Sequence, residues 1–473
     1  MTSATAPTTT AAKATFDSAS LEGLIAGSRL PAWASDLRRA ALESALRLGI
    51  PDRRDENWMR TDLRLFRPGA WGPRPAPGAV AMPAGLLGTA IASGEAMESG
   101  FDDVGPSDRE SGRLAGRFHA IDGHVVHESL DPAVAAKGVL FGSAERLLAD
   151  HGDTLRPHWF RVIDSQADWF AAMHAAFHAA SAVLYVPAGV RIAEPLEVLA
   201  TITDGGVDTS HVLVVLGDGA EATVLTETAG GGAAGAGSGF HGAAGSGGFH
   251  CGGTEIVVGK NAFLRIVNLQ NWNNGVWHVA RQKAVVHERG RLQWTLGALG
   301  SRLSQVAQDV ALVGRGADAQ VNGVMFTEGR QQLVYNTLQH HEAPSCKSDL
   351  LYKGALQDRS RLVWRGMIKV DKAAQKTDGY QRNDNLMLSK TARADSIPGL
   401  EIEADDVRCT HGATSGRVDA EQIFYAKARG LSADEAARLV VAGFFQQVFD
   451  RITILPVREA LARAIGSRIR RVS

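Results

Sequence analysis

Cysteine is scarce in this chain, and its three cysteines lie far apart. Cys251, Cys346 and Cys409 are the only ones in 473 residues, and no two of them form a CxxC pair. Three such widely separated cysteines exclude a disulfide framework, and they make a reducing, cytoplasmic compartment the expected location of the protein. It also means that the chain by itself lacks the four thiolates that hold a stable metal–sulfur cluster.

Neither sign of charge is in excess, and long apolar runs are missing. Fifty Lys and Arg residues against fifty-one Asp and Glu residues leave a net charge of −1, so no global field attracts nucleic acid or an anionic membrane. No stretch has the roughly 18–20 uninterrupted apolar residues of a membrane span. Residues 1–15 lack the apolar core of a secretory signal and are predicted to form a disordered tail. We therefore expect neither nucleic acid nor membrane among the partners.

Residues 16–182 are predicted to form a helical and mixed N-terminal domain. Apolar residues recur at helical spacing over Pro31–Leu48, and Gly49 ends the run. Asp122-Gly123 lies between two alternating segments and is a strong signal for a two-residue β-hairpin. The Ala-rich segment Gln166–Ala182 predicts another helix.

Residues 183–415 contain short β-rich runs and almost no helical period. A polar or Gly turn followed by an alternating strand recurs at Asp218-Gly219-Ala220, Lys260-Asn261-Ala262, Arg289-Gly290-Arg291, Arg315-Gly316-Ala317, Asp358-Arg359-Ser360 and Lys390-Thr391-Ala392. The middle residues of these turns are 42, 29, 26, 43 and 32 positions apart. We interpret the longer steps as two coils of about 21 residues each. Short strands without crossover helices fit a solenoid of stacked parallel strands or a large sandwich.

The strands of this region supply candidate inward-facing residues. We expect the following to point into the core: Leu213, Val215, Val257, Ile266, Leu292, Trp294, Leu312, Val321, Leu351 and Val363. The segment Ala229–Gly253 interrupts the pattern with Gly, Ala and Ser and has no apolar period able to bury a core. It is predicted to be a flexible insertion, residues 229–253, between coils.

Residues 416–473 return to the helical period and are predicted to form a C-terminal helical domain. Asp419–Arg429 is a candidate helix closed by Gly430. Ser432 and Glu435 match a capping box for a second helix, and Pro456 is placed to begin a third.

The pair of residues with the most specific chemistry is Cys409 and His411. If they lie on a strand, residues two apart share a face, so the thiol and the imidazole point the same way. Such a pair suits iron, zinc or a nascent cluster, but two ligands leave a tetrahedral ion half coordinated. A buried Cys beside a hydrogen-bonded His is the structural alternative.

The remaining histidines and cysteines give weaker indications. His340 and His341 are adjacent, so they face opposite sides of a strand and make poor co-ligands. His241, His250 and Cys251 lie in or beside the Gly-rich segment, where a preorganised metal site is not expected. The chain has no GxSxG, HExxH, kinase or Walker motif.

A dense series of motifs runs from Trp364 into the C-terminal helices. Its members are Trp364, Ala374–Asp378, Gln381, Asn385–Ser389, Pro398–Ile402, Cys409–Thr414, Gly416, Phe424-Tyr425, Arg429-Gly430 and Gly443-Phe444. Together with Glu56–Trp58 and Thr61–Leu63, this series closely resembles the SufB/SufD family of the Suf iron–sulfur cluster assembly system. The resemblance implies a mainly β fold, a right-handed parallel β-helix between helical N- and C-terminal domains.

Two positions resemble SufD-type rather than SufB-type chains. Asn383 stands where SufB-type chains carry a Cys, and Gly412 follows His411 where they carry a Glu. The resemblance thus implies a non-catalytic SufD-type scaffold subunit that pairs with a SufB-type paralogue. A SufC-type ATPase would dock on the C-terminal helices, about Asp419–Arg471. His411 and Cys409 would then be candidate interface ligands to a transient iron–sulfur cluster shared with the partner.

Other interpretations stay open at this stage. The chain could be a SufB-like paralogue, a β-helical polysaccharide lyase or hydrolase, or a purely structural solenoid. The sequence also leaves open the cluster type, the sulfur donor, flavin binding and homodimer formation when the chain is alone.

Overall fold

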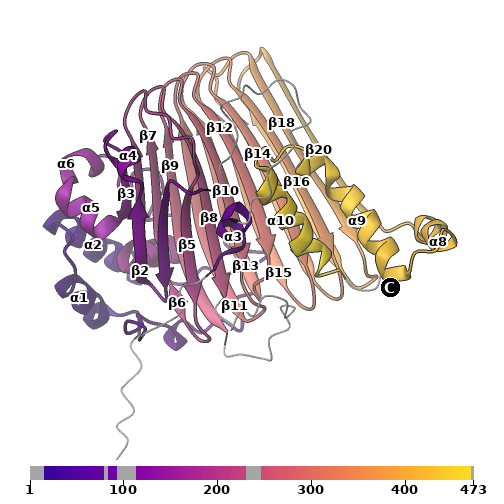
Figure 1. Cartoon of the computed structure of the whole chain (residues 1–473), viewed down its shortest axis with the longest axis horizontal. Coiled ribbons are helices and arrows are strands. Elements are labelled where there is room, and N and C mark those ends of the chain that lie inside the picture. The colour runs from indigo at the N-terminus through magenta and orange to yellow at the C-terminus, as the bar shows by residue number, and fades with distance from the viewer. Residues whose placement is uncertain (1–14, 79–83, 93–112, 231–246, 470–473) are drawn as a thin grey trace, which may run out of the picture.

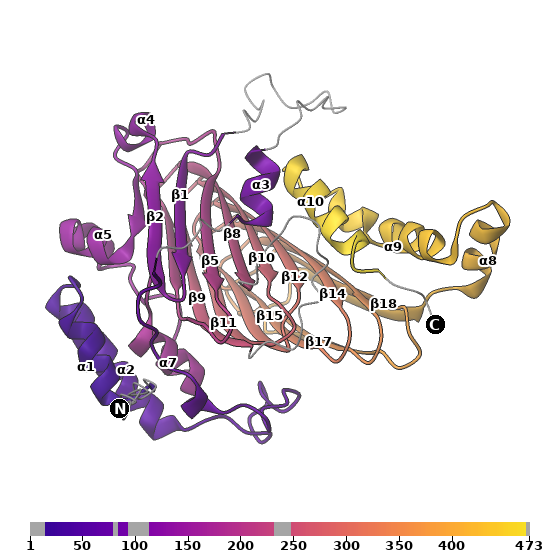
Figure 2. The same ribbon diagram turned by 60° about the horizontal axis from the view of Figure 1, so that its bottom comes forward.

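The computed structural model describes residues 15–78, 84–92, 113–230 and 247–469. Its strands form two long sheets that face each other along one axis (Figures 1 and 2). The first sheet consists, in spatial order, of β2 (His124–Leu130), β1 (Gly116–Ile121), β5 (Leu196–Ile202), β8 (Glu221–Gly230), β10 (Phe263–Asn271), β12 (Arg291–Leu299), β14 (Asp318–Thr327), β16 (Lys347–Leu356), β18 (Thr377–Met387) and β20 (Val407–Arg417). The second consists of β19 (Arg393–Ile402), β17 (Arg361–Val370), β15 (Gln332–His341), β13 (Leu303–Leu312), β11 (Val276–Val286), β9 (Gly248–Val258), β7 (His211–Leu216), β4 (Ala182–Val186) and β3 (Leu140–Ser143), with β6 (Val207–Asp208) beside β9.

Helices lie at both ends of the chain and on the outer faces of the sheets. They are α1 (Ser18–Ala26), α2 (Ala32–Leu48), the 3-10 turn η1 (Pro68–Ala70), α3 (Leu86–Ala92), α4 (Pro132–Ala135), α5 (Ala144–Asp150), α6 (Gly152–Leu155), α7 (Trp169–Phe177), α8 (Ala420–Ala428), α9 (Ala433–Phe449) and α10 (Leu455–Gly466). None of the helices in the described ranges is long and apolar enough to cross a bilayer.

From β7 to β20 the chain alternates between the sheets, and each strand pairs in parallel with the strand one coil away. This is a parallel β-helix, as predicted. Antiparallel pairs, β1 with β2 and β3 with β4, lie at its N-terminal end. Because β1 also pairs with β5, the strands before residue 183 are continuous with the solenoid sheets.

The predicted coil length is wrong. The in-register positions Leu264, Leu292, Ala319, Ser348 and Gly379 follow one another at intervals of 28, 27, 29 and 31 residues. Each coil is longer than predicted because it holds two strands and two turns. The step of 42 residues is one enlarged coil, since Ala222 pairs directly with Leu264. The step of 43 residues begins at the turn before β14, a strand of the first sheet, and ends at the turn before β17, a strand of the second sheet. It therefore does not correspond to a whole number of coils.

The Gly-rich segment is shorter than the predicted insertion. Residues 229–230 end β8 and residues 248–253 begin β9, while residues 231–246, His241 among them, lie outside the described part of the chain. Two glycines of β9 are required by packing. A Cβ on Gly253 would lie 2.4 Å from the His174 ring, and a Cβ on Gly252 would lie 2.6 Å from the His250 ring.

The two sheets enclose an apolar inner core, and helices cover their outer faces. Ile266, Leu292, Trp294, Leu312 and Val321 lie in the inner core, as predicted. Other residues predicted to point inward lie on outer faces instead: Leu213, Val215 and Val257 pack under the N-terminal helices, and Leu351 packs under α9 and α10. Val363 lies between the inward-facing Leu362 and Trp364, so it points outward. Both faces of these strands are buried, so apolar character alone does not distinguish them.

Local sequence signals set the boundaries of several elements. The hairpin between β1 and β2 turns at Asp122 and Gly123, whose φ angles are 49° and 78°. Gly49 ends α2 with a positive φ. At α9, the Ser432 hydroxyl and the Glu435 carboxylate form the predicted capping box.

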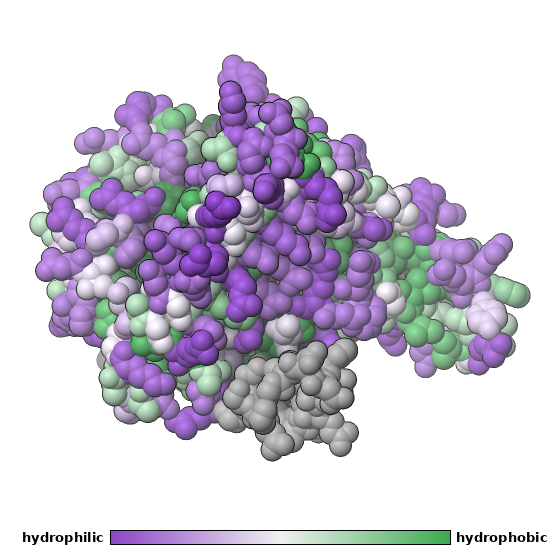
Figure 3. Space-filling model, turned by 90° about the horizontal axis from the view of Figure 1, so that it is seen from above, coloured by the Kyte–Doolittle hydropathy of each residue, from purple (hydrophilic) through white to green (hydrophobic). Residues whose placement is uncertain are grey.

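The C-terminal helices reach beyond the sheets (Figures 1 and 2). α10 and α9 pack on the outer face of the first sheet beside α3, whereas α8 projects away from it. Phe424 and Tyr425 of α8 are 74% and 61% exposed, and Leu439 of α9 is 60% exposed. Figure 3 shows apolar residues gathered on this projecting end.

A cluster of buried polar side chains holds the N-terminal layer on the second sheet. The Glu255 carboxylate accepts hydrogen bonds from the backbone amides of Phe160, Val162 and Ile163 at 2.8, 2.6 and 2.7 Å. His211 Nε2 lies 3.2 Å from the same carboxylate. A carboxylate that collects several donors satisfies its own charge and fixes the loop that supplies them.

Three further histidines are buried: His174 and His178 lie in this region, and His278 of β11 lies beside Trp272 and His250. The pKa of each lies well below 6.5, chiefly because burial removes water from the charged form. For His178, the neighbouring Arg38 guanidinium lowers the pKa further. These side chains therefore remain neutral in the folded protein under mildly acidic conditions.

We expect the free energy of unfolding to fall as the pH drops below about 6.5, because the unfolded chain then binds protons that the folded chain does not. Each such histidine contributes up to about 1.4 kcal/mol per pH unit. Urea denaturation at a series of pH values should show a shallower fall for His174→Gln than for the unmodified chain. The exposed His151→Gln is the control and should leave the slope unchanged. An unaltered slope in His174→Gln would contradict the prediction.

Candidate functional site

The candidate site lies at the C-terminal end of the solenoid, on β20. Within the described residues, β19 and β20 are the last strands of their sheets, and each pairs with a neighbour on one side only. Most residues of β20 are exposed, although its backbone is fully extended over Val407–Arg417. The strand therefore presents a long unpaired edge with side chains that solvent reaches.

Cys409 lies on the inner face of β20. It packs against Ile368 and Val370 of β17, in the opposite sheet, and against Ala374 in the turn that follows β17. A Cβ placed on Gly379, the partner of Cys409 in β18, would lie 3.2 Å from the Cys409 sulfur. Glycine at this position therefore leaves room for the thiol.

His411 lies two residues further along β20, on the same face as Cys409, and it is exposed. It stands in register with Gln381 of β18. The Gln381 amide is fixed inside the coil, because its Nε2 donates to the Gly399 carbonyl at 2.9 Å. The imidazole thus lies at the mouth of the solenoid over an ordered polar neighbour.

Asn383 is buried on the same inner face of β18, in register with Ala413. Its side-chain oxygen accepts hydrogen bonds from Ser396 at 2.5 Å and from Asn385 at 2.7 Å. Its amide nitrogen donates to the Tyr352 carbonyl at 3.3 Å. Both ends of this amide are therefore occupied within the chain.

The side chains of Cys409 and His411 are too few and too weakly activated to hold a metal ion without further ligands. Burial raises the pKa of the Cys409 thiol, although the Gly379 backbone amide partly offsets the effect. Metal binding must then displace the thiol proton, which weakens affinity at neutral pH. Among the described residues, no group of three or more His, Cys, Asp or Glu side chains is arranged to hold a metal ion. Cys409 and His411 supply at most two donors.

The other histidines singled out from the sequence are engaged elsewhere. His340 and His341 of β15 face opposite sides, as predicted: His340 lies 2.9 Å from Asp371, while buried His341 lies 2.8 Å from the Ser348 hydroxyl. Burial lowers the pKa of His341 to about 4.

His250 and Cys251 are strand residues, not loop residues as predicted. Both are buried in β9: His250 pairs with Asp208 at 2.8 Å, and Cys251 packs in the aromatic cluster around Phe170. Burial raises the pKa of the Cys251 thiol. The two side chains point to opposite faces of the strand and do not form a joint metal site.

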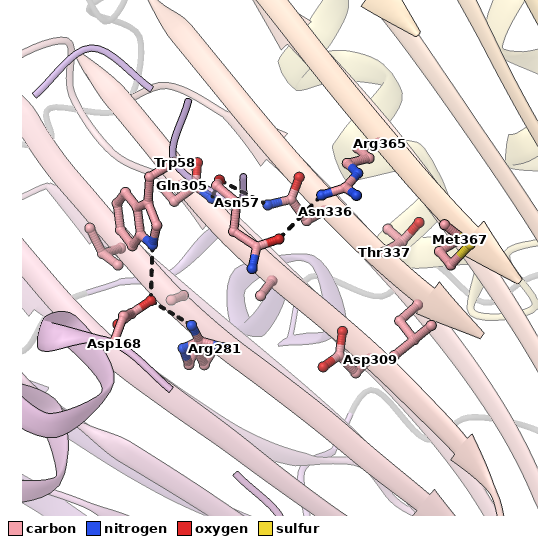
Figure 4. A pocket seen from close by; sticks show the side chains of 14 residues that line it. Asn57, Trp58, Asp168, Arg281, Gln305, Asp309, Asn336, Thr337, Arg365 and Met367 are labelled. Carbon is pink, nitrogen blue, oxygen red and sulfur yellow. Dashed lines mark hydrogen bonds and ion pairs between the residues drawn. The ribbon is translucent and has the colours of Figure 1, made fainter. Parts of the chain in front are cut away.

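The Glu56–Trp58 motif fastens the N-terminal segment to the second sheet (Figure 4). The Trp58 indole donates to Asp168 at 3.0 Å, and Asp168 also binds Arg281. The Asn57 carbonyl accepts from Gln305 at 3.1 Å. These residues line a cavity of about 280 Å³. Their partners lie more than 100 residues away, so the motif's role was not visible in the sequence.

A chain of contacts connects α9 with β20. The Lys353 ammonium on β16 donates to the Phe444 carbonyl of α9 at 2.9 Å and lies 3.9 Å from Asp384 of β18. Asp384 in turn accepts a hydrogen bond from Thr414 of β20 at 2.6 Å. Lys353 and Asp384 are both buried. The edge strand is thus linked to the C-terminal helices by charged and hydrogen-bonded side chains.

Comparison with known proteins gives one consistent result. The family model described as "SUF system FeS cluster assembly, SufBD core domain" matches residues 200–444. An iron–sulfur cluster assembly SufBD family protein of Staphylococcus epidermidis is 26% identical over 361 residues, which is 74% of each chain. Relatives of the same description from Staphylococcus saprophyticus and Staphylococcus aureus are 26% and 24% identical over the same length and shares.

The three thiols should differ in reactivity. Cys251 and Cys346 are buried, whereas Cys409 is partly exposed, so we expect a disulfide reagent to label only Cys409 in the folded protein. Its rate should still rise above pH 9.0, the ordinary pKa, because the Cys409 pKa is raised. Cys409→Ser should abolish labelling until urea is added. Earlier reaction at either of the other thiols would contradict the structure.

Proposed function

The chain belongs to the SufBD family of iron–sulfur cluster assembly proteins, and from this membership we propose a specific place in the assembly. It acts as a SufD-type scaffold subunit that pairs with a SufB-type paralogue and with a SufC-type ATPase. The nascent iron–sulfur cluster is the cargo of this complex, and it is built where the two paralogous subunits meet. The subunit itself catalyses no reaction.

The observation that carries the proposal is the exposed His411 on an unpaired strand edge. A row of free backbone N–H and C=O groups is a ready template for a strand of another chain. β20 offers such a row over eleven residues. On β19, Leu400 and Ile402 are exposed large apolar residues beside it. A paralogous subunit that pairs with these edges would bring its own side chains to His411.

The residues around His411 favour a shared site over a self-contained one. Cys409 and His411 give two donors, and a tetrahedral iron needs four ligands or bridging sulfides. A site completed by the partner binds its cluster only in the complex, which suits a scaffold that must release its product. The neighbouring Asn383, where SufB-type chains carry a Cys, is neutral and already hydrogen-bonded at both ends. This favours the SufD-type assignment.

The projecting C-terminal helices supply a surface for the ATPase subunit. Phe424, Tyr425 and Leu439 are exposed on these helices. Figure 3 shows apolar residues gathered at this end of the molecule, and exposed apolar clusters are typical of protein interfaces. The contacts from Phe444 through Lys353 and Asp384 to Thr414 lead from these helices to β20. A movement of the helices during ATP turnover would therefore reach the strand that carries His411.

We expect His411→Ala to lower the cluster content of the co-expressed three-protein complex by roughly tenfold, the scale on which the loss of one metal-site residue lowers affinity. The yield is read from the visible absorption spectrum and from iron and sulfide analysis. Because His411 is exposed, complex formation on size-exclusion chromatography should be unaffected. The matched control is His151→Ala, a surface histidine at the end of α5. A normal cluster content in His411→Ala would remove the proposed role.

We expect Phe424→Asp combined with Leu439→Asp to abolish co-purification of the ATPase, because a charge in a buried apolar contact is costly. Both positions are exposed in the isolated subunit, so its melting temperature should hardly change. Leu46→Asp on α2, where Leu46 is 72% exposed, is the control and should retain the ATPase. Retention by the double variant, or loss in the control, would count against this docking surface.

A further inference from the structure

A groove lined by six arginines lies away from the candidate cluster site. It has a volume of about 420 Å³ and runs between the N-terminal segment and two turns of the solenoid. Its arginines are Arg53, Arg60, Arg64, Arg330, Arg359 and Arg361, and the only acidic residue in its lining is Asp62. The net charge of the whole chain is −1, so this concentration of positive charge does not reflect the general composition.

Few of these charges are neutralised within the described part of the chain. Arg64 pairs with Asp62 at 2.7 Å, and Arg361 pairs with Asp395 at 2.6 Å. The guanidinium groups of the other four arginines have no ion pair or hydrogen bond to a described residue. The pKa of Asp62 is lowered to about 2, chiefly by the hydrogen bond from Arg64, and Arg53 contributes to the effect.

The walls of the groove are held in fixed positions. Gln332 donates to the Arg60 carbonyl at 2.6 Å, which fixes the N-terminal segment against β15. The two turns are joined because the Arg359 amide donates to the Gly329 carbonyl at 2.9 Å. Arg330 and Arg359 therefore occupy equivalent positions in adjacent coils, about 4.8 Å apart along the stack.

Like charges on adjacent coils repel each other, and an anion bound between them would relieve this repulsion. Guanidinium groups bind phosphate oxygens through paired N–H donors, and they do so better than ammonium groups. The groove offers little for other ligands. Met59 is the one apolar side chain in its lining, so it provides no aromatic surface for a base and no apolar pocket for the anchor residues of a protein.

We propose that this groove binds a small polyphosphate anion. Arg330 and Arg359 hold it from the solenoid, and Arg53 and Arg60 hold it from the N-terminal segment. Binding is electrostatic, so it weakens as salt is added. The site is independent of the proposed cluster chemistry, because no residue of β20 takes part.

The test is isothermal titration calorimetry of the full-length protein with inorganic pyrophosphate and tripolyphosphate at low and high salt. We expect one site per chain that weakens with salt. Arg330→Gln with Arg359→Gln should lower the affinity about tenfold or more, and Arg53→Gln with Arg60→Gln, from the opposite wall, should do the same. The matched control is Arg161→Gln with Arg315→Gln, two exposed arginines outside the groove.

All four arginines of the groove variants lie on surface segments, and circular dichroism melting identifies any variant that fails to fold. A lack of pyrophosphate and tripolyphosphate binding would overturn the proposal. So would equal weakening in the control variant. Binding of a Glu-rich peptide without binding of pyrophosphate would overturn it too and assign the groove to an acidic protein segment.

Discussion

The structure depends on the parallel backbone ladder that joins each coil to the next. Every inner strand pairs on both sides, and the register continues without a break from β8 to β20 in the first sheet. Because the strands pair in register, the position of a residue in one coil determines the position of its partner in the next coil, about thirty residues later. At the C-terminal end of the described residues the ladder stops at β19 and β20, and the hydrogen-bonding groups of their outer edges have no neighbouring strand there.

The chemistry of the candidate site follows from where the ladder ends. An inward-facing side chain in the middle of the solenoid is covered by the next coil, as Gln381 and Asn383 are. On β20, the terminal strand of the first sheet in the described residues, no further coil covers the inward-facing side chains. Cys409 is therefore only partly buried, and His411 is exposed. Two donors in such a position complement a partner's site better than they form one of their own.

The same ladder separates two kinds of surface on this subunit. The turns on one side of the solenoid carry Arg330 and Arg359 in a groove whose other wall is the N-terminal segment. The outer face of the first sheet carries α9, and Lys353 and Asp384 connect this helix to the terminal strand. The proposed sites of cluster assembly, ATPase docking and anion binding therefore lie on separate parts of one subunit.

The sequence by itself determined the features that depend on neighbouring residues. The Asp122-Gly123 turn, the stop at Gly49, the capping box of Ser432 and the common face of Cys409 and His411 all arise within a few positions of the chain. The tertiary structure alone decided the coil length, the inclusion of His250 in β9, the outward orientation of Leu213 and Leu351, and the grouping of distant arginines. The physical reason is that these features depend on pairing between residues 27–42 or more positions apart, where the strands are buried on both faces and apolar pattern does not reveal which side faces inward.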